Sequence, residues 1–117
     1  MTNEMINNEM MSFEDLDRVS GGTIAEMKEL RTALHAKSVG GDKVAMNAFK
    51  IVEALENKFG NNGPANLISA YAIEHALNKC YGVKANISVG LFGTGRGEKN
   101  NTYDGRTHQQ VLDLINK

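Results

Sequence analysis

The sequence predicts a mainly α-helical fold: a small helical bundle with one short β segment and a glycine-rich loop near the C-terminus, preceded by a short amphipathic helix. Apolar residues recur every three or four positions through long segments of the chain, which is the spacing of one helix face. Turn signals separate those segments, at Gly40-Gly41 and at Asn61-Asn62-Gly63-Pro64. The length of 117 residues suits one small domain.

Helices are expected over residues 24–37, 43–59 and 64–80. Asp42 is a good N-cap for the second helix, and Pro64 suits the first position of the third. The third is apolar nearly all round, with Glu74 and His75 as interruptions. Such a helix belongs in the core of a bundle. The alternative is a segment that inserts into a target membrane.

The pattern changes after the third helix. Residues 83–92 alternate between apolar and polar side chains, and a period of two predicts a strand. A single strand is not stable alone, so its partner is expected in the following segment or in another copy of the chain. A glycine-rich loop should cover residues 93–105. A last short helix is predicted over residues 107–116.

Charge is unevenly distributed along the chain. Residues 1–22 carry five carboxylates against Arg18, a net charge of −4, whereas residues 23–117 carry 12 Lys or Arg against 9 Asp or Glu, a net charge of +3. An acidic head on a mildly basic body indicates that the two parts act separately. A charge of +3 permits attraction to anionic membranes, but it is far below that of nucleic-acid-binding proteins, so no nucleic-acid partner is expected.

Cysteine and histidine usage gives no sign of metal or cofactor chemistry. Cys80 is the one cysteine, so no intrachain disulfide is possible, and in an apolar helix it is expected to be an inert small hydrophobe. His35, His75 and His108 lack metal-ligand spacing. The loop 90–97 lacks the Gly-Lys-Ser/Thr ending of a phosphate-binding loop. We therefore expect no cofactor and no enzymatic activity.

One group of residues suits acid–base chemistry. Arg106 and His108, with Glu98 nearby in sequence, would fit a secreted nuclease or another acid–base enzyme. Nothing else in the sequence supports such an activity.

The first 22 residues have the features of a recognition segment. Ser12 followed by Asp15 fits the capping pattern that starts a helix, and Gly21-Gly22 would end it. A helix this short is marginal in water and should fold mainly when its apolar stripe meets a groove on a partner. The stripe comprises Ile6, Met10, Phe13, Leu16 and Val19.

This segment resembles the leader of double-glycine peptide precursors, which are substrates of ABC transporters with a papain-like cysteine peptidase domain. In that family, counted back from the last leader residue, the fourth and seventh places are aliphatic, and usually the twelfth is too. The last leader residue here would be Gly22. Val19, Leu16 and Met11 fill these places, with Met as a conservative departure from Leu. The resemblance implies that these three residues bind the peptidase domain. It also implies cleavage after Gly22.

The cleavage site would comprise Gly21, Gly22 and Thr23. Because glycine has no side chain, a cleft too narrow for other residues can hold Gly-Gly beside the catalytic thiol. A second pair, Gly40-Gly41, provides an internal control. The fourth and seventh places before it are polar, Ser38 and His35. Only the first pair therefore fits the leader pattern.

A structural alternative for Gly21-Gly22 is a turn between two helices. Thr23-Ile24-Ala25-Glu26 fits a capping box, so a helix is expected to start there whether or not the chain is cleaved.

The resemblance implies a bacteriocin-like antimicrobial precursor, made in the bacterial cytoplasm and secreted after leader cleavage. The expected partners are the transporter, a target-cell membrane or receptor, on which the body would act non-enzymatically, and an immunity protein. A body of 95 residues is long for a signalling peptide, which is the other usual cargo. The alternatives are a secreted signalling peptide, an intracellular helical binding module such as a bacteriocin immunity-like protein, and a small secreted enzymatic toxin.

Overall fold

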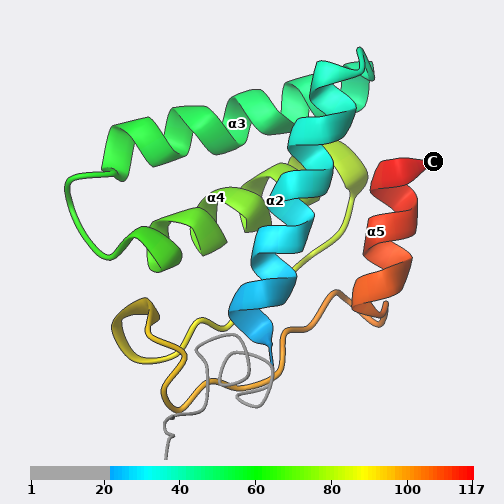
Figure 1. Ribbon diagram of the computed structural model, residues 1–117. Coiled ribbons are helices and arrows are strands. Elements are labelled where there is room, and N and C mark those ends of the chain that lie inside the picture. The colour runs from blue at the N-terminus through cyan, green and yellow to red at the C-terminus, as the bar shows by residue number, and fades with distance from the viewer. Residues whose placement is uncertain (1–21) are drawn as a thin grey trace, which may run out of the picture.

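The computed structural model describes residues 22–117. Its α-helices are α2 (Thr23–Val39), α3 (Lys43–Phe59), α4 (Ala65–Tyr81) and α5 (His108–Asn116), and a short 3-10 helix, η1 (Leu91–Gly93), lies between α4 and α5. In Figure 1, α3 and α4 form a pair that α2 crosses, and α5 stands next to α2. Because α2 contacts all three other α-helices, its position determines how the bundle is arranged.

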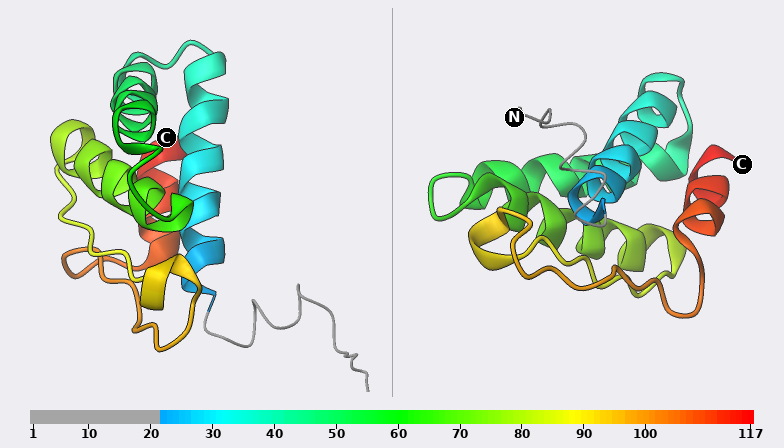
Figure 2. Two further views of the ribbon diagram at one scale, coloured as in Figure 1. Left: turned by 90° about the vertical axis from the view of Figure 1, so that its left-hand side faces the viewer. Right: turned by 60° about the horizontal axis from the view of Figure 1, so that its bottom comes forward.

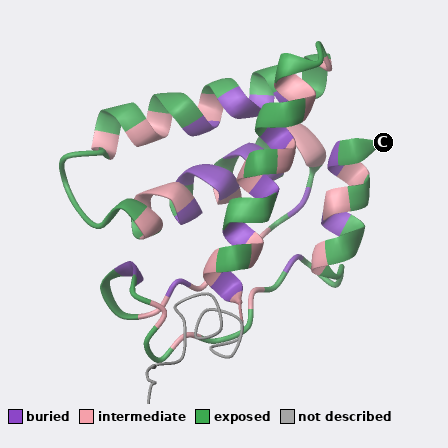
Figure 3. Cartoon of the chain, viewed as in Figure 1, coloured by how far each residue is buried: buried purple, intermediate pink, exposed green. Residues whose placement is uncertain are grey.

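One hydrophobic core lies where these helices meet. Figure 3 shows the buried positions facing inward on each helix, with exposed positions on the outer faces. Burying a large aliphatic side chain contributes about 1.5–3 kcal/mol, so this core is the main source of stability. Its largest fully buried side chains are Met27, Leu30, Leu34, Val52, Ile73, Leu77, Val83, Val111 and Ile115.

The predicted helical fold is confirmed, and the observed helix bounds lie within two residues of the expected ones. Local signals explain the ends. Asp42 caps α3 by accepting a hydrogen bond from the backbone N–H of Ala45 at 2.9 Å. Thr107 and Gln110 form a capping box at the start of α5, and Gly82 ends α4 with a φ of 66°, which glycine adopts without strain.

The prediction of a strand over residues 83–92 is wrong, because no strand forms among the described residues. A single antiparallel bridge joins Asn86 to Thr102. The neighbouring N–H groups donate to side chains instead: that of Ile87 to Glu74 at 2.7 Å, and that of Ser88 to Asn101 at 2.6 Å. Carboxylate and amide oxygens thus replace the backbone acceptors that a paired strand would supply.

The alternation of side chains in this segment nevertheless has a structural counterpart. Val83, Ile87 and Val89 are buried in the core, and the residues between them are partly or fully exposed. Leu91, expected on the same inward face, lies in η1 and is 61% exposed. The period of two thus predicted which side chains are buried up to residue 89, but not the hydrogen bonding of the backbone.

Helix α4 is a core helix of the bundle. Ala70, Ala72, Ile73, Ala76 and Leu77 are buried, and among residues 22–117 no helix is both long enough and apolar enough to cross a membrane. Burial raises the pKa of Glu74, although its carboxylate accepts the hydrogen bond from Ile87. Cys80 is half-buried rather than fully buried, and burial raises the pKa of its thiol, which makes it a poor nucleophile.

Candidate functional site

The predicted cleavage site lies at the start of α2. Gly22 is the N-cap, with φ 67° and ψ 21° in the left-handed region. Its carbonyl oxygen accepts a hydrogen bond from the N–H of Glu26 at 2.7 Å. Thr23 is therefore the first helical residue, and the Gly22–Thr23 peptide bond leads directly into the helix.

Thr23 is covered by the segment that leads towards α5. Its exposed fraction is 2%. Its hydroxyl donates to a carboxylate oxygen of Glu98, and its carbonyl oxygen accepts from Nδ2 of Asn101 at 3.1 Å. These partners are 75 and 78 positions away in sequence, so tertiary packing creates the environment of the cleavage site.

Glu26 and Tyr103 complete this group. The Oε1 atom of Glu26 accepts from Nδ2 of Asn101 at 2.9 Å and from the hydroxyl of Tyr103 at 3.1 Å. Burial, with the neighbouring Glu26 carboxylate as a second cause, raises the pKa of Tyr103, so its hydroxyl remains a donor. We call Thr23, Glu26, Glu98, Asn101 and Tyr103 the junction cluster. Figure 2 shows the blue start of α2 beside the yellow and orange segments that follow α4.

Thr23 and Glu26 do not form the capping box that their spacing suggests. Gly22 is the N-cap, and no side chain caps the helix. The hydroxyl of Thr23 donates to Glu98, and the carboxylate of Glu26 accepts from Asn101 and Tyr103. The helix begins one residue earlier than a capping box at Thr23 requires, and both side chains bond to the distant segment instead.

Sequence reasoning missed Asn101 and Tyr103. Neither belongs to a motif, and more than 70 residues separate them from the cleavage site, so no local pattern points to them. The other residues of the predicted leader, including Met11, Leu16, Val19 and Gly21, lie outside the residues that the structure describes.

The residues considered for acid–base chemistry have separate partners. Glu98 binds Thr23, whereas Nε2 of His108 lies 2.6 Å from Oε1 of Glu29. The Oε1 atom of Glu98 is buried and has no hydrogen-bond partner among the described residues. Arg106 is exposed. Within the same part of the chain, no group of three or more His, Cys, Asp or Glu side chains could hold a metal ion.

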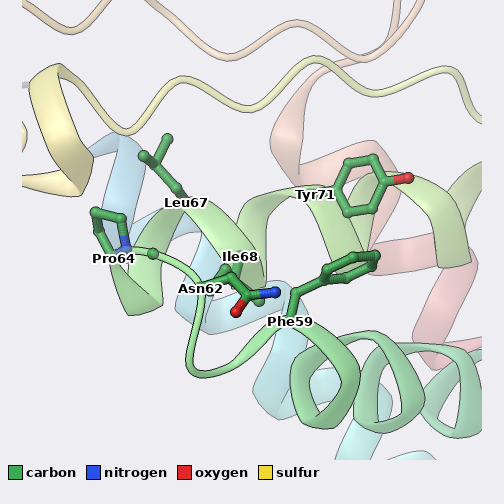
Figure 4. A pocket seen from close by; sticks show the side chains of 7 residues that line it. Phe59, Asn62, Pro64, Leu67, Ile68 and Tyr71 are labelled. Atoms are coloured by element: carbon green, nitrogen blue, oxygen red, sulfur yellow. The ribbon is translucent and has the colours of Figure 1, made fainter.

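A second candidate site is an apolar groove where α3 turns into α4. Its volume is about 460 Å³, and it includes Phe59, Pro64, Leu67, Ile68 and Tyr71 (Figure 4). The rings of Phe59 and Tyr71 meet edge to face, with centroids 6.2 Å apart. Leu67 and Tyr71 remain 40% and 45% exposed. Grouped exposed side chains of this size are typical of an interaction surface.

The 3-10 helix η1 extends this apolar surface. Leu91 and Phe92 are 61% and 69% exposed, and Leu91 lines a hollow that shares Leu67 with the groove. Phe92 has a φ of 54°, a left-handed conformation that costs a non-glycine residue about 1–2 kcal/mol. Phe92 thus combines an exposed aromatic side chain with a strained backbone. We call Phe59, Leu67, Tyr71, Leu91 and Phe92 the apolar face.

Packing on α4 fixes η1 in place. The Nδ2 atom of Asn66 donates to the carbonyl oxygen of Gly93 at 2.8 Å. A Cβ atom added to Gly93 would lie 3.1 Å from Cβ of Asn66. The contact is close because residue 93 has no side chain.

Cations border the apolar face. Lys99 lines the hollow that contains Leu67 and Leu91, and Lys58 lies over the ring of Phe59, with Nζ 5.4 Å from its centroid. Arg96 is exposed in the same loop. The carboxylate of Glu98 binds Thr23 and does not extend outward with these cations. The surface thus combines aromatic and aliphatic side chains with positive charge.

Comparisons of the chain with protein families, curated proteins and solved structures found no match. Both candidate sites therefore rest on the residues of this chain.

Proposed function

We propose that this chain is the precursor of a secreted bacteriocin-like antimicrobial peptide. Residues 1–22 are the leader, an ABC transporter with a peptidase domain cleaves after Gly22, and residues 23–117 are the mature product. The observation that carries the proposal is the placing of Leu16 and Val19 before Gly21-Gly22, which the second glycine pair lacks.

The position of helix α2 supports this division. Helix α2 begins at Thr23, the first residue of the proposed product. The core described above is formed by residues 27–115, all of which remain in the product. Cleavage after Gly22 thus removes none of those side chains.

The apolar face supports action on a membrane rather than on a receptor. Leu91 and Phe92 are exposed, Lys99 lines the same hollow as Leu91, and the body carries a net charge of +3. Exposed aromatic side chains bury apolar area at a membrane interface, and the cations attract anionic lipids. The mature product would act non-enzymatically on an anionic target-cell membrane, and an immunity protein would protect the producing cell.

Two matched glycine substitutions test the cleavage proposal. Gly22 and Gly41 both have a positive φ, 67° and 93°, and a Cβ atom added to either meets nothing within 4 Å. Because the φ of Gly41 lies farther from the left-handed helical region, Gly41→Leu introduces at least as much backbone strain as Gly22→Leu. We expect Gly22→Leu to abolish leader removal and secretion, because a leucine does not fit the narrow cleft, while Gly41→Leu is processed normally.

The readout is the amount and mass of the product in the medium of cells that express the transporter. Normal processing of the Gly22→Leu chain would refute cleavage after Gly22. Full-length protein found only inside the cells would favour the alternative, an intracellular helical binding module whose apolar groove takes a partner.

A further inference from the structure

We propose that folding of the body withholds the Gly22–Thr23 bond from the peptidase, so that leader removal requires the junction cluster and the first turn of α2 to open. This inference rests on the proposed function, because it concerns regulation of the same cleavage site. In the cell, processing would then precede completion of the fold.

The carbonyl group of Gly22 is the first obstacle to cleavage. A cysteine peptidase attacks this carbonyl carbon and stabilises the developing negative charge on its oxygen with donors of its own. In the fold, the same oxygen accepts the 2.7 Å hydrogen bond from the N–H of Glu26. This bond occupies one of the two lone pairs of the oxygen and competes with the donors of the peptidase.

Backbone conformation is the second obstacle. A narrow cleft binds Gly-Gly as an extended chain, but Gly22 is left-handed and the helix starts immediately after it. An extended backbone across the bond therefore requires the first turn of α2 to unwind.

The third obstacle lies on the C-terminal side of the bond. Thr23 is 2% exposed, and both its hydroxyl and its carbonyl oxygen are bonded to residues of the covering segment. A Cβ atom added to Gly95 would lie 3.5 Å from Cδ1 of Ile24, so this segment packs closely on the next residue as well. A peptidase cannot enclose Thr23 until the segment moves away.

These contacts predict the size of the effect. Proteolysis that proceeds through an opened state follows the population of that state when opening and closing are fast. Opening breaks several hydrogen bonds, which each contribute roughly 0.5–1.5 kcal/mol net. We therefore expect the folded chain to be cleaved on the order of 100-fold more slowly than an unfolded substrate with the same cleavage site.

A peptidase assay tests this inference separately from the proposed function. The isolated peptidase domain of a double-glycine transporter is given a peptide of residues 1–30 and the full chain. Rapid cleavage of the peptide with slow cleavage of the full chain supports the inference. Equal rates overturn it while leaving the proposed function intact, whereas an uncleaved peptide contradicts the proposed function itself.

Two neighbouring asparagines provide a matched pair of variants. Asn101→Ala removes the donor to Thr23 and Glu26 and the acceptor of the Ser88 N–H. We expect it to speed cleavage of the full chain about 10-fold, from the loss of the two bonds to Thr23 and Glu26. Asn100→Ala alters an exposed neighbour and should leave the rate unchanged. Equal effects of the two substitutions would argue against the junction cluster as the cause.

Amide hydrogen exchange gives a readout that needs no peptidase. The N–H of Glu26 should exchange slowly in the full chain, because it is hydrogen-bonded to Gly22. Asn101→Ala should accelerate this exchange by the same factor by which it speeds cleavage. Fast exchange of this amide in the unsubstituted chain would overturn the inference, since the first turn would then already be open.

Discussion

Glu56, in α3, links three helices through the hydrogen bonds of its carboxylate. Its two carboxylate oxygens accept hydrogen bonds from Arg31 of α2. The donor atoms are Nη2, at 2.6 Å, and Nε, at 2.9 Å. Ser69 of α4 donates to the same carboxylate at 2.8 Å. The hydrogen bonds from Arg31 lower the pKa of Glu56 below its ordinary value of 4.5 despite partial burial, because they favour the ionised form.

Stability should therefore depend on pH through Glu56. Its pKa is lower in the folded state than in the unfolded state, so its contribution is present above the unfolded value and is lost as pH falls through the folded value. We expect Glu56→Gln to lower the thermal midpoint by about 4 °C at pH 7, allowing for the partly exposed Arg31 side chain. Thermal unfolding at pH 7 and pH 3 checks this. A difference between the two proteins that does not shrink at pH 3 would contradict the assignment.

Phe92 allows function to be separated from stability. Because Phe92 is 69% exposed, Phe92→Ser removes little packing. We expect the mature protein with Phe92→Ser to bind anionic vesicles about 10-fold more weakly, from roughly 1.4 kcal/mol of lost apolar burial, with an unchanged thermal midpoint. Vesicle co-sedimentation measures the affinity.

Val39→Ser is the control for this prediction. Val39 is the last residue of α2 and is 75% exposed. It does not belong to the apolar face, whose residues Leu91 and Phe92 lie in η1, which packs on α4. An equal loss of binding in both variants would refute a specific role for the apolar face.

The contact between η1 and α4 determines how the apolar face is presented. Asn66 and Gly93 approach closely, and this holds η1, with Leu91 in the hollow that shares Leu67 with the groove. The position of η1 therefore depends on glycine at position 93, where a side chain would press against Asn66.

Substitution of Gly93 tests this dependence. Gly93→Ala adds a Cβ atom 3.1 Å from Cβ of Asn66, at a φ of 77°. Gly97→Ala has a similar φ of 70° but meets nothing within 4 Å, so it controls for backbone strain alone. We expect Gly93→Ala to lower the thermal midpoint by several degrees more, about 4 °C for each additional 1 kcal/mol. Equal midpoints would show that the contact contributes nothing.

Elements differ in how far the sequence predicted them. The helices follow from apolar periodicity and from capping residues such as Asp42, which are local properties. The strand over residues 83–92 was wrong because periodicity reports which side chains are buried, and not which acceptors reach the backbone. The side chains of Glu74 and Asn101 are those acceptors, and their approach depends on tertiary structure.

The candidate sites show the same limit. Gly22 and Thr23 could be identified from the leader pattern, but the burial of Thr23 depends on Glu98 and Asn101, far away in sequence. The exposure of Phe92 was equally unpredictable, because it depends on how η1 packs against α4. Local sequence thus predicts where the chain would be cut, while tertiary contacts determine whether the bond is accessible.

At the scale of the whole molecule, we propose that the chain divides at Gly22. The acidic residues 1–22 and the basic residues 23–117 carry net charges of −4 and +3, and the described core is formed by residues 27–115. The first part would direct export, and the second would fold and act on a membrane. The junction cluster would link the two by making cleavage depend on an unfolded junction.

The most direct test is the intact mass of the protein that producing cells release into their medium. We predict a single product whose N-terminal residue is Thr23, and no such product in cells without the peptidase-containing transporter. Full-length chain that stays with the cells, or a released product that retains Gly22, would contradict cleavage at the double glycine.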